Sequence, residues 1–417
     1  MFEKENLKEI IKSQQTLLKD INLGYIREEY LQQLRQSIRL NYAVAIMGPR
    51  RAGKSTILYQ FMPEIKNDYY YLNFDDERLF NFKLTDFENL LLAFYELYGN
   101  SHKYFLFDEI QNINSWELFI NRLLRSGKYV IITGSNLTLT KGELATKLTG
   151  RHIDLYVYPF SFKEYIFAKK VNLENTKTTE EKAILDVYFQ EYFLYGGFPD
   201  VLVKKDIFVL QALYNDIITK DVFYKKQILV KELSNYLMYN VSTLVSLNNL
   251  AKFFKLRNNS IPKKIIEILT DSFLFNTIDI YSHSYKQRIA NAKKVYAIDV
   301  GLVHAISTKI LENKGLDFEN IVFLELKRRY KDVYYFKENG LDVDFIVVDK
   351  NKNILPIQVC YDVSIAKTKK REEDALLNIM NKLKIKEGII ITKDYKAEVV
   401  TTEYKIKYIK VIDFLLD

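Results

Sequence analysis

One stretch constrains this chain more than any other: Gly48-Pro49-Arg50-Arg51-Ala52-Gly53-Lys54-Ser55, followed by Thr56. An apolar run ends at Met47 and an apolar helical pattern starts after Ser55, so the order is buried strand, glycine loop, helix start. In such a loop the glycines let successive backbone N–H groups point inward, and the helix N-terminus adds the positive end of its dipole. The stretch therefore predicts a P-loop that binds the phosphates of a nucleotide.

Two side chains of this loop are predicted to act directly on the nucleotide. Lys54 would reach the β and γ phosphates, and the hydroxyl of Ser55 would ligate Mg²⁺. The alternative is a glycine loop that matches the pattern by accident in a long chain. The flanking strand and helix favour the functional interpretation.

Bulk composition indicates a folded chain of several domains. Its 417 residues exceed what one core normally fills, so two or three domains are expected. No apolar run approaches the length of about 18 residues that spans a membrane, and the N-terminus lacks a signal-peptide pattern. Cys360 is the single cysteine, which excludes an internal disulfide and a cysteine-based zinc cluster. We expect a soluble, cytoplasmic protein without a membrane partner.

The net charge of +8 is concentrated in one part of the chain. Residues 220–300 contain 13 Lys or Arg against 6 Asp or Glu, a surplus of 7. A local basic surplus is the electrostatic footprint of a polyanion partner, and a merely solvated surface is the alternative.

A second motif supplies the acids that a phosphate site needs. The apolar run Tyr104-Phe105-Leu106-Phe107 leads directly into Asp108-Glu109, which is the pattern of a Walker B element. Asp108 would hold Mg²⁺ through water, and Glu109 would orient and deprotonate the attacking water. A further apolar strand, residues 69–74, separates this motif from the P-loop. That spacing and Glu109 favour ATP hydrolysis by a glutamate-dependent enzyme over a small GTPase or a nucleotide kinase.

Polar residues also follow the next strand, which we place at residues 129–133. Gly134-Ser135-Asn136 comes directly after it. In ATPases of this branch a polar residue here touches the γ-phosphate or the lytic water, so Ser135 or Asn136 is a candidate sensor. Turn chemistry alone is the alternative explanation of these residues.

The motifs together resemble a known family. Gly-Pro-Arg-Arg-Ala-Gly-Lys-Ser, Leu-Phe-Asp-Glu-Ile-Gln, Thr-Gly-Ser-Asn, Gly-Arg and Pro-Phe-Ser-Phe-Lys-Glu-Tyr occur in this order from residue 48 to residue 165. The chain resembles the archaeal and bacterial AAA-type ATPases that carry a winged helix and a restriction-endonuclease-like C-terminal domain. The resemblance implies an α/β fold with a five-stranded parallel sheet flanked by helices. It implies ATP and Mg²⁺ at the carboxyl ends of the strands.

The resemblance also implies a domain plan and an arginine contact. Arg151 stands at the family's Gly-Arg, so it would contact the γ-phosphate in cis or in trans, with a structural salt bridge as the alternative. The expected domains are a P-loop ATPase core (1–170), a helical lid (171–226), a winged helix (227–300) and a restriction-endonuclease-like domain (301–417).

The pattern of the basic region, residues 220–300, predicts the order helix, turn, helix and hairpin. Helices are expected at residues 247–254 and 261–269, and strands at residues 273–278 and 294–298 would pair as a wing. This arrangement predicts a winged helix that binds duplex or branched DNA, although such modules also bind proteins or act as rigid linkers. The candidate DNA contacts are Lys263 and Lys264 at the start of the recognition helix and Lys286 and Arg288 in the wing, where Tyr285 would also lie.

The last 117 residues follow the order helix, three strands, helix, strand, which resembles the restriction-endonuclease-like fold. An active enzyme of that type needs two acids and an acid-x-lysine on the third strand, because the carboxylates bind Mg²⁺ and the lysine steadies the hydroxide. Glu325 and Asp344 match the first two acids, while Gln358 and Cys360 stand in place of the third acid and the lysine. We expect an inactive domain, unless a register shift supplies Lys367.

Three functions follow, in order of preference. The first is an ATPase that couples hydrolysis of ATP to ADP to conformational change on DNA. The second is a regulatory switch that gates a protein partner, and the third is an ATP-dependent nuclease. Assembly into a homo-oligomer stays open.

Overall fold

The computed structural model describes residues 2–135, 148, 150–171, 178–222, 227–307, 314–338 and 340–417. The chain divides into two compact units, Met1–Tyr158 and Pro159–Asp417, and each is described by itself. Across the described residues, no helix combines the length and the apolar character needed to cross a bilayer.

The first unit is built on a five-stranded sheet in the order β2-β3-β4-β1-β5. All neighbouring strands run parallel, which confirms the sheet predicted for the nucleotide-binding core. The inner strands of such a sheet are covered on both faces, so they are largely apolar runs, and β1 is buried at every position. The strands are β1 (Ala43–Met47), β2 (Tyr69–Asn73), β3 (Tyr104–Asp108), β4 (Tyr129–Gly134) and β5 (His152–Tyr156).

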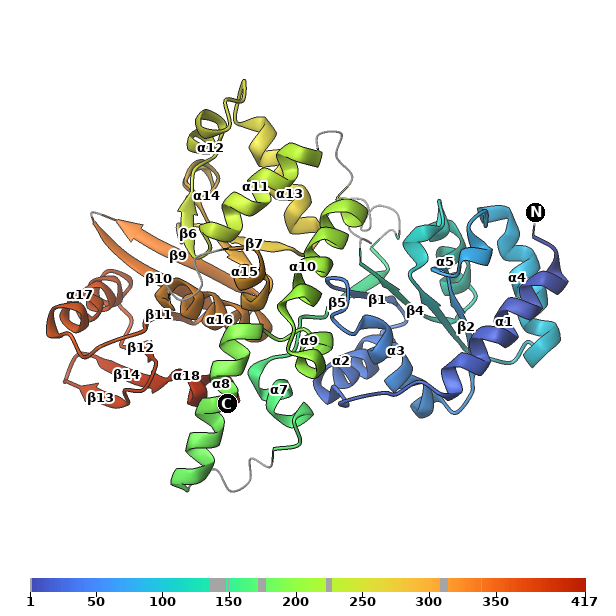
Figure 1. The fold of residues 1–417 in the computed structure, drawn as a ribbon, viewed down its shortest axis with the longest axis horizontal. Helices are drawn as coiled ribbons and strands as arrows, with labels where there is room; N and C mark the ends of the chain where they lie inside the picture. Colours follow the sequence, from blue (N-terminus) through green and yellow to red (C-terminus); the bar gives the residue numbers. More distant parts are fainter. Residues whose placement is uncertain are drawn as a thin grey trace. The chain divides into compact units, whose positions relative to one another are not determined.

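Helices cover both faces of this sheet, drawn from blue to teal in Figure 1. Successive side chains of a strand face opposite sides, and Val44 and Ile46 of β1 join one apolar cluster with residues of α2 and α3. On the other face the rings of Phe87 in α4 and Phe119 in α5 stack 4.0 Å apart. Phe119 also lies 5.8 Å from the ring of Phe107 in β3. The helices are α1 (Lys4–Lys19), α2 (Glu28–Ile38), α3 (Lys54–Phe61), α4 (Phe87–Tyr98) and α5 (Trp116–Arg125), with 3-10 turns η1 (Met62–Ile65), η2 (Glu77–Leu79), η3 (Leu84–Asp86) and η4 (Ile110–Asn112).

The second unit contains helices followed by a small antiparallel sheet in the order β6-β8-β7. On α13 the buried residues Pro262, Ile265 and Leu269 recur at helical spacing, which leaves Lys263 and Lys264 exposed on the opposite side. The elements are α7 (Phe162–Ala168), α8 (Thr179–Tyr195), α9 (Pro199–Lys204), α10 (Ile207–Asp216), the π-helix η5 (Ile217–Asp221), α11 (Gln227–Tyr239), β6 (Thr243–Val245), α12 (Leu247–Phe253), α13 (Ser260–Asp271), β7 (Phe275–Ile278), α14 (Tyr285–Ala290) and β8 (Lys293–Ala297).

This region confirms the predicted helix pair and the pairing of the last two strands, and it adds two elements. Strand β6 pairs with the other edge of β8. A helix, α14, interrupts the connection between β7 and β8, because the hydroxyl of Ser284 accepts a hydrogen bond from the backbone N–H of Gln287 and caps its first turn. Tyr285, Lys286 and Arg288 therefore lie on a helix and not on a plain hairpin.

The rest of the second unit is organised around a six-stranded mixed sheet in the order β13-β14-β12-β11-β10-β9. The predicted order of helix, three strands, helix and strand is present as α16, β9 to β11, α17 and β12. Strands β9, β10 and β11 pair antiparallel, and β12 joins β11 in parallel. The elements are α15 (Val300–Ile306), α16 (Lys314–Arg329), β9 (Asp332–Glu338), β10 (Leu341–Val348), β11 (Ile354–Cys360), α17 (Ala366–Leu383), β12 (Glu387–Thr392), β13 (Ala397–Val400), β14 (Lys405–Lys410) and α18 (Val411–Leu416).

Candidate functional site

The glycine loop connects β1 to α3, which begins at Lys54. Gly53 has φ of 92°, a left-handed conformation that favours glycine, and it caps the helix. A Cβ added at Gly48 would lie 2.2 Å from the carbonyl oxygen of Val157, so the loop also needs glycine there for close backbone approach. The side chain of Lys54 is buried, and its Nζ donates to the carbonyl oxygen of Pro49 at 3.1 Å. The loop therefore holds its lysine against its own backbone.

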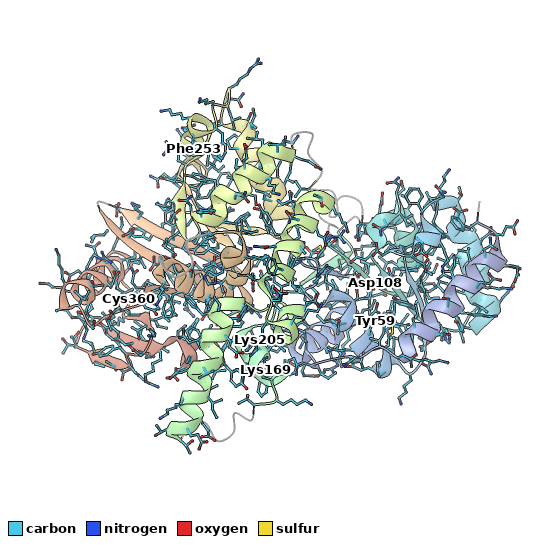
Figure 2. All side chains as sticks on the ribbon, in the orientation of Figure 1. Tyr59, Asp108, Lys169, Lys205, Phe253 and Cys360 are labelled. Atoms are coloured by element: carbon cyan, nitrogen blue, oxygen red, sulfur yellow. The ribbon has the colours of Figure 1, made fainter. Side chains whose placement is uncertain are left out.

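Asp108 ends β3 at the same edge of the sheet and is surrounded by hydroxyl groups. Its Oδ1 accepts a hydrogen bond from Ser55 Oγ at 2.9 Å and another from Thr133 Oγ1, while its Oδ2 accepts one from the Tyr59 hydroxyl at 3.1 Å. Tyr59 and Asp108 are labelled in Figure 2. Burial raises the pKa of Asp108 above its ordinary value, and the neighbouring Glu109 raises it further, while the hydroxyl donors lower it.

The side-chain oxygens of Ser55 and Asp108 are suitable ligands for Mg²⁺. Within the described part of the chain no group of three His, Cys, Asp or Glu side chains could hold a metal ion. Mg²⁺ does not need such a cage, because it usually keeps several waters and takes one or two protein oxygens together with substrate phosphates. Ser55 Oγ and Asp108 Oδ1, 2.9 Å apart beside the P-loop, are the residues that would hold it.

Glu109 follows Asp108 with an unusual backbone. Its φ of 50° and ψ of 42° place a non-glycine residue in the left-handed region, at a cost of about 1 kcal/mol or more. The backbone N–H of Glu109 donates to Thr133 Oγ1 at 3.1 Å, and its Oε2 accepts a hydrogen bond from Gln111 Nε2 at 2.5 Å. Glu109 is thus aimed by contacts to the neighbouring strand and to its own loop.

Ser135 lies directly after β4, the strand between the Walker B strand β3 and the P-loop strand β1. Its side chain is only 2% exposed, and its Oγ has no hydrogen-bond partner among the described residues. A buried hydroxyl of this kind is costly unless a ligand or another group satisfies it. Asn136, the other candidate sensor, lies outside the described residues.

Arg151 is far from the loop that it was expected to reach in cis. It directly precedes β5, and its carbonyl oxygen accepts a hydrogen bond from the N–H of Ala43 at the start of β1. The P-loop follows the other end of β1. Because five residues of strand span about 16 Å, Arg151 lies at the amino edge of the sheet, opposite the P-loop. The predicted cis contact is therefore wrong, and the trans contact stays a prediction.

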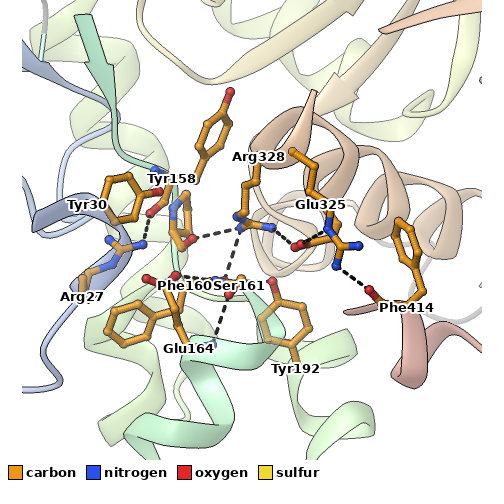
Figure 3. Close-up of polar contacts among 12 residues, drawn as sticks. Arg27, Tyr30, Tyr158, Phe160, Ser161, Glu164, Tyr192, Glu325, Arg328 and Phe414 are labelled. Carbon is orange, nitrogen blue, oxygen red and sulfur yellow. Dashed lines mark hydrogen bonds and ion pairs between the residues drawn. The ribbon is translucent and has the colours of Figure 1, made fainter. Parts of the chain in front are cut away.

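Two residues that support this site, Arg27 at the loop and Tyr59 at Asp108, escaped sequence analysis. Arg27 is 2% exposed, and its guanidinium donates to the carbonyl oxygen of Ala52 at 2.9 Å. It also donates to the carbonyl oxygen of Tyr158 at 3.0 Å and lies over the ring of Tyr30 (Figure 3). Nothing in its local pattern distinguishes it from a surface arginine. Tyr59 could have been found, because a residue four positions after Ser55 on a helix lies on the same face.

The candidate DNA contacts differ in their surroundings. Lys263 and Lys264 are exposed on α13, and Lys263 Nζ lies 4.0 Å from a carboxylate oxygen of Glu267. Lys286 is exposed on α14. Arg288 is partly buried, because its guanidinium lies over the ring of Tyr334 and donates to that residue's hydroxyl at 3.3 Å. Arg288 is therefore held within the unit.

Asp344 and Gln358 meet as the sequence predicts. Gln358 Oε1 accepts a hydrogen bond from the N–H of Asp344 at 3.1 Å, and its Nε2 donates to Glu372 Oε2 at 2.5 Å. The thiol of Cys360 donates to the carbonyl oxygen of Asp362, and burial raises its pKa to about 11. This thiol is consequently protonated near neutral pH.

Glu325 does not belong to that group, so its predicted place beside Asp344 is wrong. It pairs instead with Arg328 at 3.2 Å and Arg329 at 2.8 Å (Figure 3). The helix acid that does approach Asp344 is Glu319. Residues 319 and 325 face different directions because an α-helix turns by about 100° per residue.

A lysine that sequence analysis did not connect to this site joins the two acids. Lys294 Nζ, from β8, lies 2.7 Å from Glu319 Oε1 and 2.9 Å from Asp344 Oδ1. The hydroxyl of Tyr296 donates a hydrogen bond to Glu319 Oε1 at 2.6 Å. Burial and the charge of Asp344 raise the pKa of Glu319 to about 8, while Lys294 opposes that rise. The acids are therefore neutralised from within the chain.

Comparison with protein families identifies the first unit. Residues 40–166 match a family described as an AAA domain, so the chain contains an AAA-type P-loop ATPase domain. Residues 187–314 and 314–412 match two families that are both described as domains of unknown function.

Relatives of similar length exist in both archaea and bacteria. The chain is 33% identical over 396 residues to an uncharacterized protein, MJ1544, of Methanocaldococcus jannaschii. The matched residues make up 90% of this chain and 87% of the relative. It is 32% identical over 413 residues to an uncharacterized protein of Haemophilus influenzae, covering 94% and 98%. Among solved structures, the Walker-type ATPase PABY2304 of Pyrococcus abyssi is similar over 69% of this chain and 99% of its own chain, at 15% identity and with a TM-score of 0.45.

Proposed function

This chain belongs to the same family as the Methanocaldococcus and Haemophilus proteins, and we propose that it hydrolyses ATP and couples the cycle to conformational change on DNA. One observation carries the ATPase proposal. Ser55, Asp108 and Glu109 gather at the carboxyl edge of a parallel sheet, beside a glycine loop and its lysine. An acid that can hold Mg²⁺ and a second acid that can take a proton from water are what phosphoryl transfer to water requires.

Each residue of this edge has a role in the proposed reaction. The backbone N–H groups of the loop and Lys54 bind the phosphates, and Ser55 and Asp108 hold Mg²⁺. Bound Mg²⁺ supplies positive charge that offsets the charge developing on the phosphate oxygens. Glu109 orients a water and accepts its proton, and Ser135 contacts the γ-phosphate or that water with its buried hydroxyl.

Nucleotide binding and phosphate release test this assignment on the full-length protein. We expect the wild type to bind ATP and release phosphate, and Lys54→Ala to lose nucleotide binding, because the lysine neutralises the β and γ phosphates. Lys128→Ala is a suitable control, because it also removes a lysine of the first unit that donates to a backbone carbonyl oxygen, that of His102. A wild-type protein that binds ATP but releases no phosphate in any condition contradicts hydrolysis.

The DNA part of the proposal rests on the second unit. The order α11, β6, α12, α13, β7, β8 and the sheet order β6-β8-β7 support a winged helix in which α13 is the recognition helix. Lys263 and Lys264 are exposed there, and the basic surplus of residues 220–300 fits a polyanion. Affinity for duplex DNA is expected to fall steeply with salt because bound cations release counterions.

A salt titration tests that expectation. The double variant Lys263→Ala with Lys264→Ala is expected to bind duplex DNA more weakly and to lower the salt slope by about 2, one for each phosphate contact. Binding that stays tight at high salt, or no binding at low salt, contradicts the DNA proposal.

We further propose that residues 301–417 form a restriction-endonuclease-like domain and that this domain is inactive. The position of the third acid is held by Gln358, and Lys294 occupies the space between Glu319 and Asp344 that a metal ion would need. Plasmid incubated with the protein and Mg²⁺ or Mn²⁺ is expected to stay intact. Nicking that disappears in Asp344→Asn would support the third function instead.

A regulatory switch that gates a protein partner is the alternative to a DNA-coupled ATPase, and the two functions differ in one measurement. A DNA-coupled ATPase is expected to release phosphate faster when duplex DNA is added, whereas a switch keeps the same slow rate.

A further inference from the structure

Phe253 is an exposed aromatic residue with a rigid support. It is the last residue of α12, and its side chain is 66% exposed. Figure 2 labels Phe253. Its ring lies 5.1 Å from the ring of Tyr236 and 5.0 Å from that of Phe254, which are themselves partly buried. The two neighbouring rings hold the largely exposed ring of Phe253 in place, so a contact made by this ring loses little side-chain entropy.

The surroundings of Phe253 are cationic. Residues 247–266, which form α12, the turn and the first half of α13, contain no Asp or Glu. The turn itself is held by a hydrogen bond of 2.8 Å from Asn259 Nδ2 to Asn248 Oδ1. Five exposed cations belong to this segment: Lys252, Lys255, Arg257, Lys263 and Lys264. The surface therefore complements a polyanion and not an apolar or a basic protein surface.

An aromatic face among cations is the combination that binds single-stranded nucleic acid. Cationic side chains follow the phosphates, and bases stack on the aromatic ring regardless of sequence, because every base has a π-face. In an intact duplex the base faces are stacked on one another, and only their edges are accessible in the grooves. A protruding ring can reach a base face only where the stack ends, at a tail, a fork or a duplex end.

We infer that Phe253 stacks on an unpaired base, so the preferred DNA of this protein has a junction between duplex and single strand. The inference rests on the proposed DNA function and narrows it to a substrate class. In this arrangement the cations of α13 hold the duplex phosphates, and Phe253 receives the first base beyond the paired region.

Binding of three DNAs to the full-length protein tests the inference: a blunt duplex, the same duplex with a single-stranded tail, and the tail strand alone. Phe253→Ala is expected to lower affinity for the tailed duplex by about tenfold and to leave the blunt duplex unchanged, because stacking contributes only where a base is free. Phe253→Trp is expected to keep the tailed-duplex affinity. Phe208→Ala, at another exposed ring of this unit that is 71% exposed, is expected to change neither.

A fluorescent base analogue placed at the first unpaired position gives a second readout. Stacking on Phe253 is expected to change its emission with the wild type and Phe253→Trp but not with Phe253→Ala. Equal affinities of Phe253→Ala and the wild type for the tailed duplex would overturn the inference while blunt-duplex binding keeps the DNA function. A wild type that binds no DNA overturns both, and loss of self-association in Phe253→Ala with DNA binding unchanged would assign the ring to a protein interface.

Discussion

Asp108 in the first unit and Asp344 in the second are both carboxylates on sheet strands, but their partners differ in kind. Asp108 accepts hydrogen bonds from the hydroxyls of Ser55, Thr133 and Tyr59. Asp344 instead faces the ammonium of Lys294, which it shares with Glu319. Hydroxyl groups are neutral and can turn to ligate a cation, whereas an ammonium has already neutralised its acids.

That difference separates a site that can take a metal ion from one that cannot. The hydroxyls leave the charge of Asp108 available to Mg²⁺, which accords with the raised pKa of this buried carboxyl. Lys294 is covalently attached and lies between its two acids, so a divalent cation would have to displace it. Two neighbouring carboxyl groups are therefore not enough to hold a metal ion where an ammonium group of the chain lies between them.

The largest expected effect comes from removing Lys294. Lys294→Met leaves Glu319 and Asp344 facing each other without a cation, and breaking a buried pair in this way costs about 3–5 kcal/mol. Lys293→Met is the matched control on the same strand, because Lys293 pairs with the partly exposed Asp279 and such pairs contribute about 1 kcal/mol at most. Urea unfolding measures both.

Equal stability of the Lys293 and Lys294 variants would contradict a cation-dependent cluster. Adding Glu319→Gln to Lys294→Met replaces the carboxyl group that faces Asp344 by a neutral amide that can donate a hydrogen bond to Asp344, so it is expected to restore part of the lost stability.

Removing the charge of Asp108 is expected to change stability little and activity strongly, whereas removing Lys294 mainly lowers stability. Asp108→Asn keeps an oxygen that can accept hydroxyl hydrogen bonds, so the free energy of unfolding is expected to change by about 1 kcal/mol or less. Phosphate release is expected to fall by at least about 100-fold, because the amide binds Mg²⁺ far more weakly than a carboxylate. Stopped phosphate release with a large loss of stability would instead make Asp108 a structural residue.

Tyr59→Phe removes one of the hydroxyl groups that donate to Asp108, and its effect is measured on the pH dependence of ATPase activity. The phenol donates to Asp108 and lowers the pKa of that carboxyl, so its removal is expected to raise that pKa further. The acidic limb of the ATPase pH profile is then expected to move to higher pH, by about one unit for one hydrogen bond to a charged group. Tyr71→Phe is the control, because the Tyr71 hydroxyl contacts that of Tyr59. An acidic limb that does not move would mean that the Tyr59 hydroxyl does not influence the pKa of Asp108.

The smallest expected effect concerns a carboxylate of the first unit that is paired with arginine. Arg78 and Gln14 lower the pKa of Asp76 to about 2, below its ordinary value. The folded state therefore binds the proton less tightly than the unfolded state, so the stabilisation is present above the ordinary pKa and is lost as the pH falls toward 2. Asp76→Asn is expected to cost about 1 kcal/mol at pH 7, since Arg78 is partly exposed.

Unfolding of Asp76→Asn and the wild type at neutral pH and near pH 3 checks this sign. The difference between the two proteins is expected to narrow as the pH falls. A difference that grows in acid would mean that Asp76 is not stabilised as a charged group.

The parts that local sequence could predict are those set by consecutive residues. The strand, loop and helix around Lys54 and the apolar run into Asp108 follow from short patterns, so the parallel sheet and the Walker motifs were found. The pairing of β7 with β8 and the order from α16 to β12 were likewise predicted from alternation and turn residues.

The parts that failed depend on how distant residues meet. Glu325 and Glu319 both lie on an amphipathic helix, and only the packing of α16 selects Glu319 to face Asp344. Lys294 joins them from a strand outside the six-stranded sheet, and no sequence pattern connects a strand lysine to that helix acid. Arg151 was misplaced because a motif carries no information about which edge of the sheet its residue occupies.

Glu109→Gln tests most directly whether Glu109 accepts the proton of the attacking water in a hydrolytic site. Phosphate release and equilibrium ATP binding are measured on the same preparation with Mg²⁺. We expect unchanged ATP binding and turnover lower by about 100-fold or more, because the amide can still orient water but cannot accept its proton. Normal turnover in Glu109→Gln would show that Glu109 is not the base of the reaction.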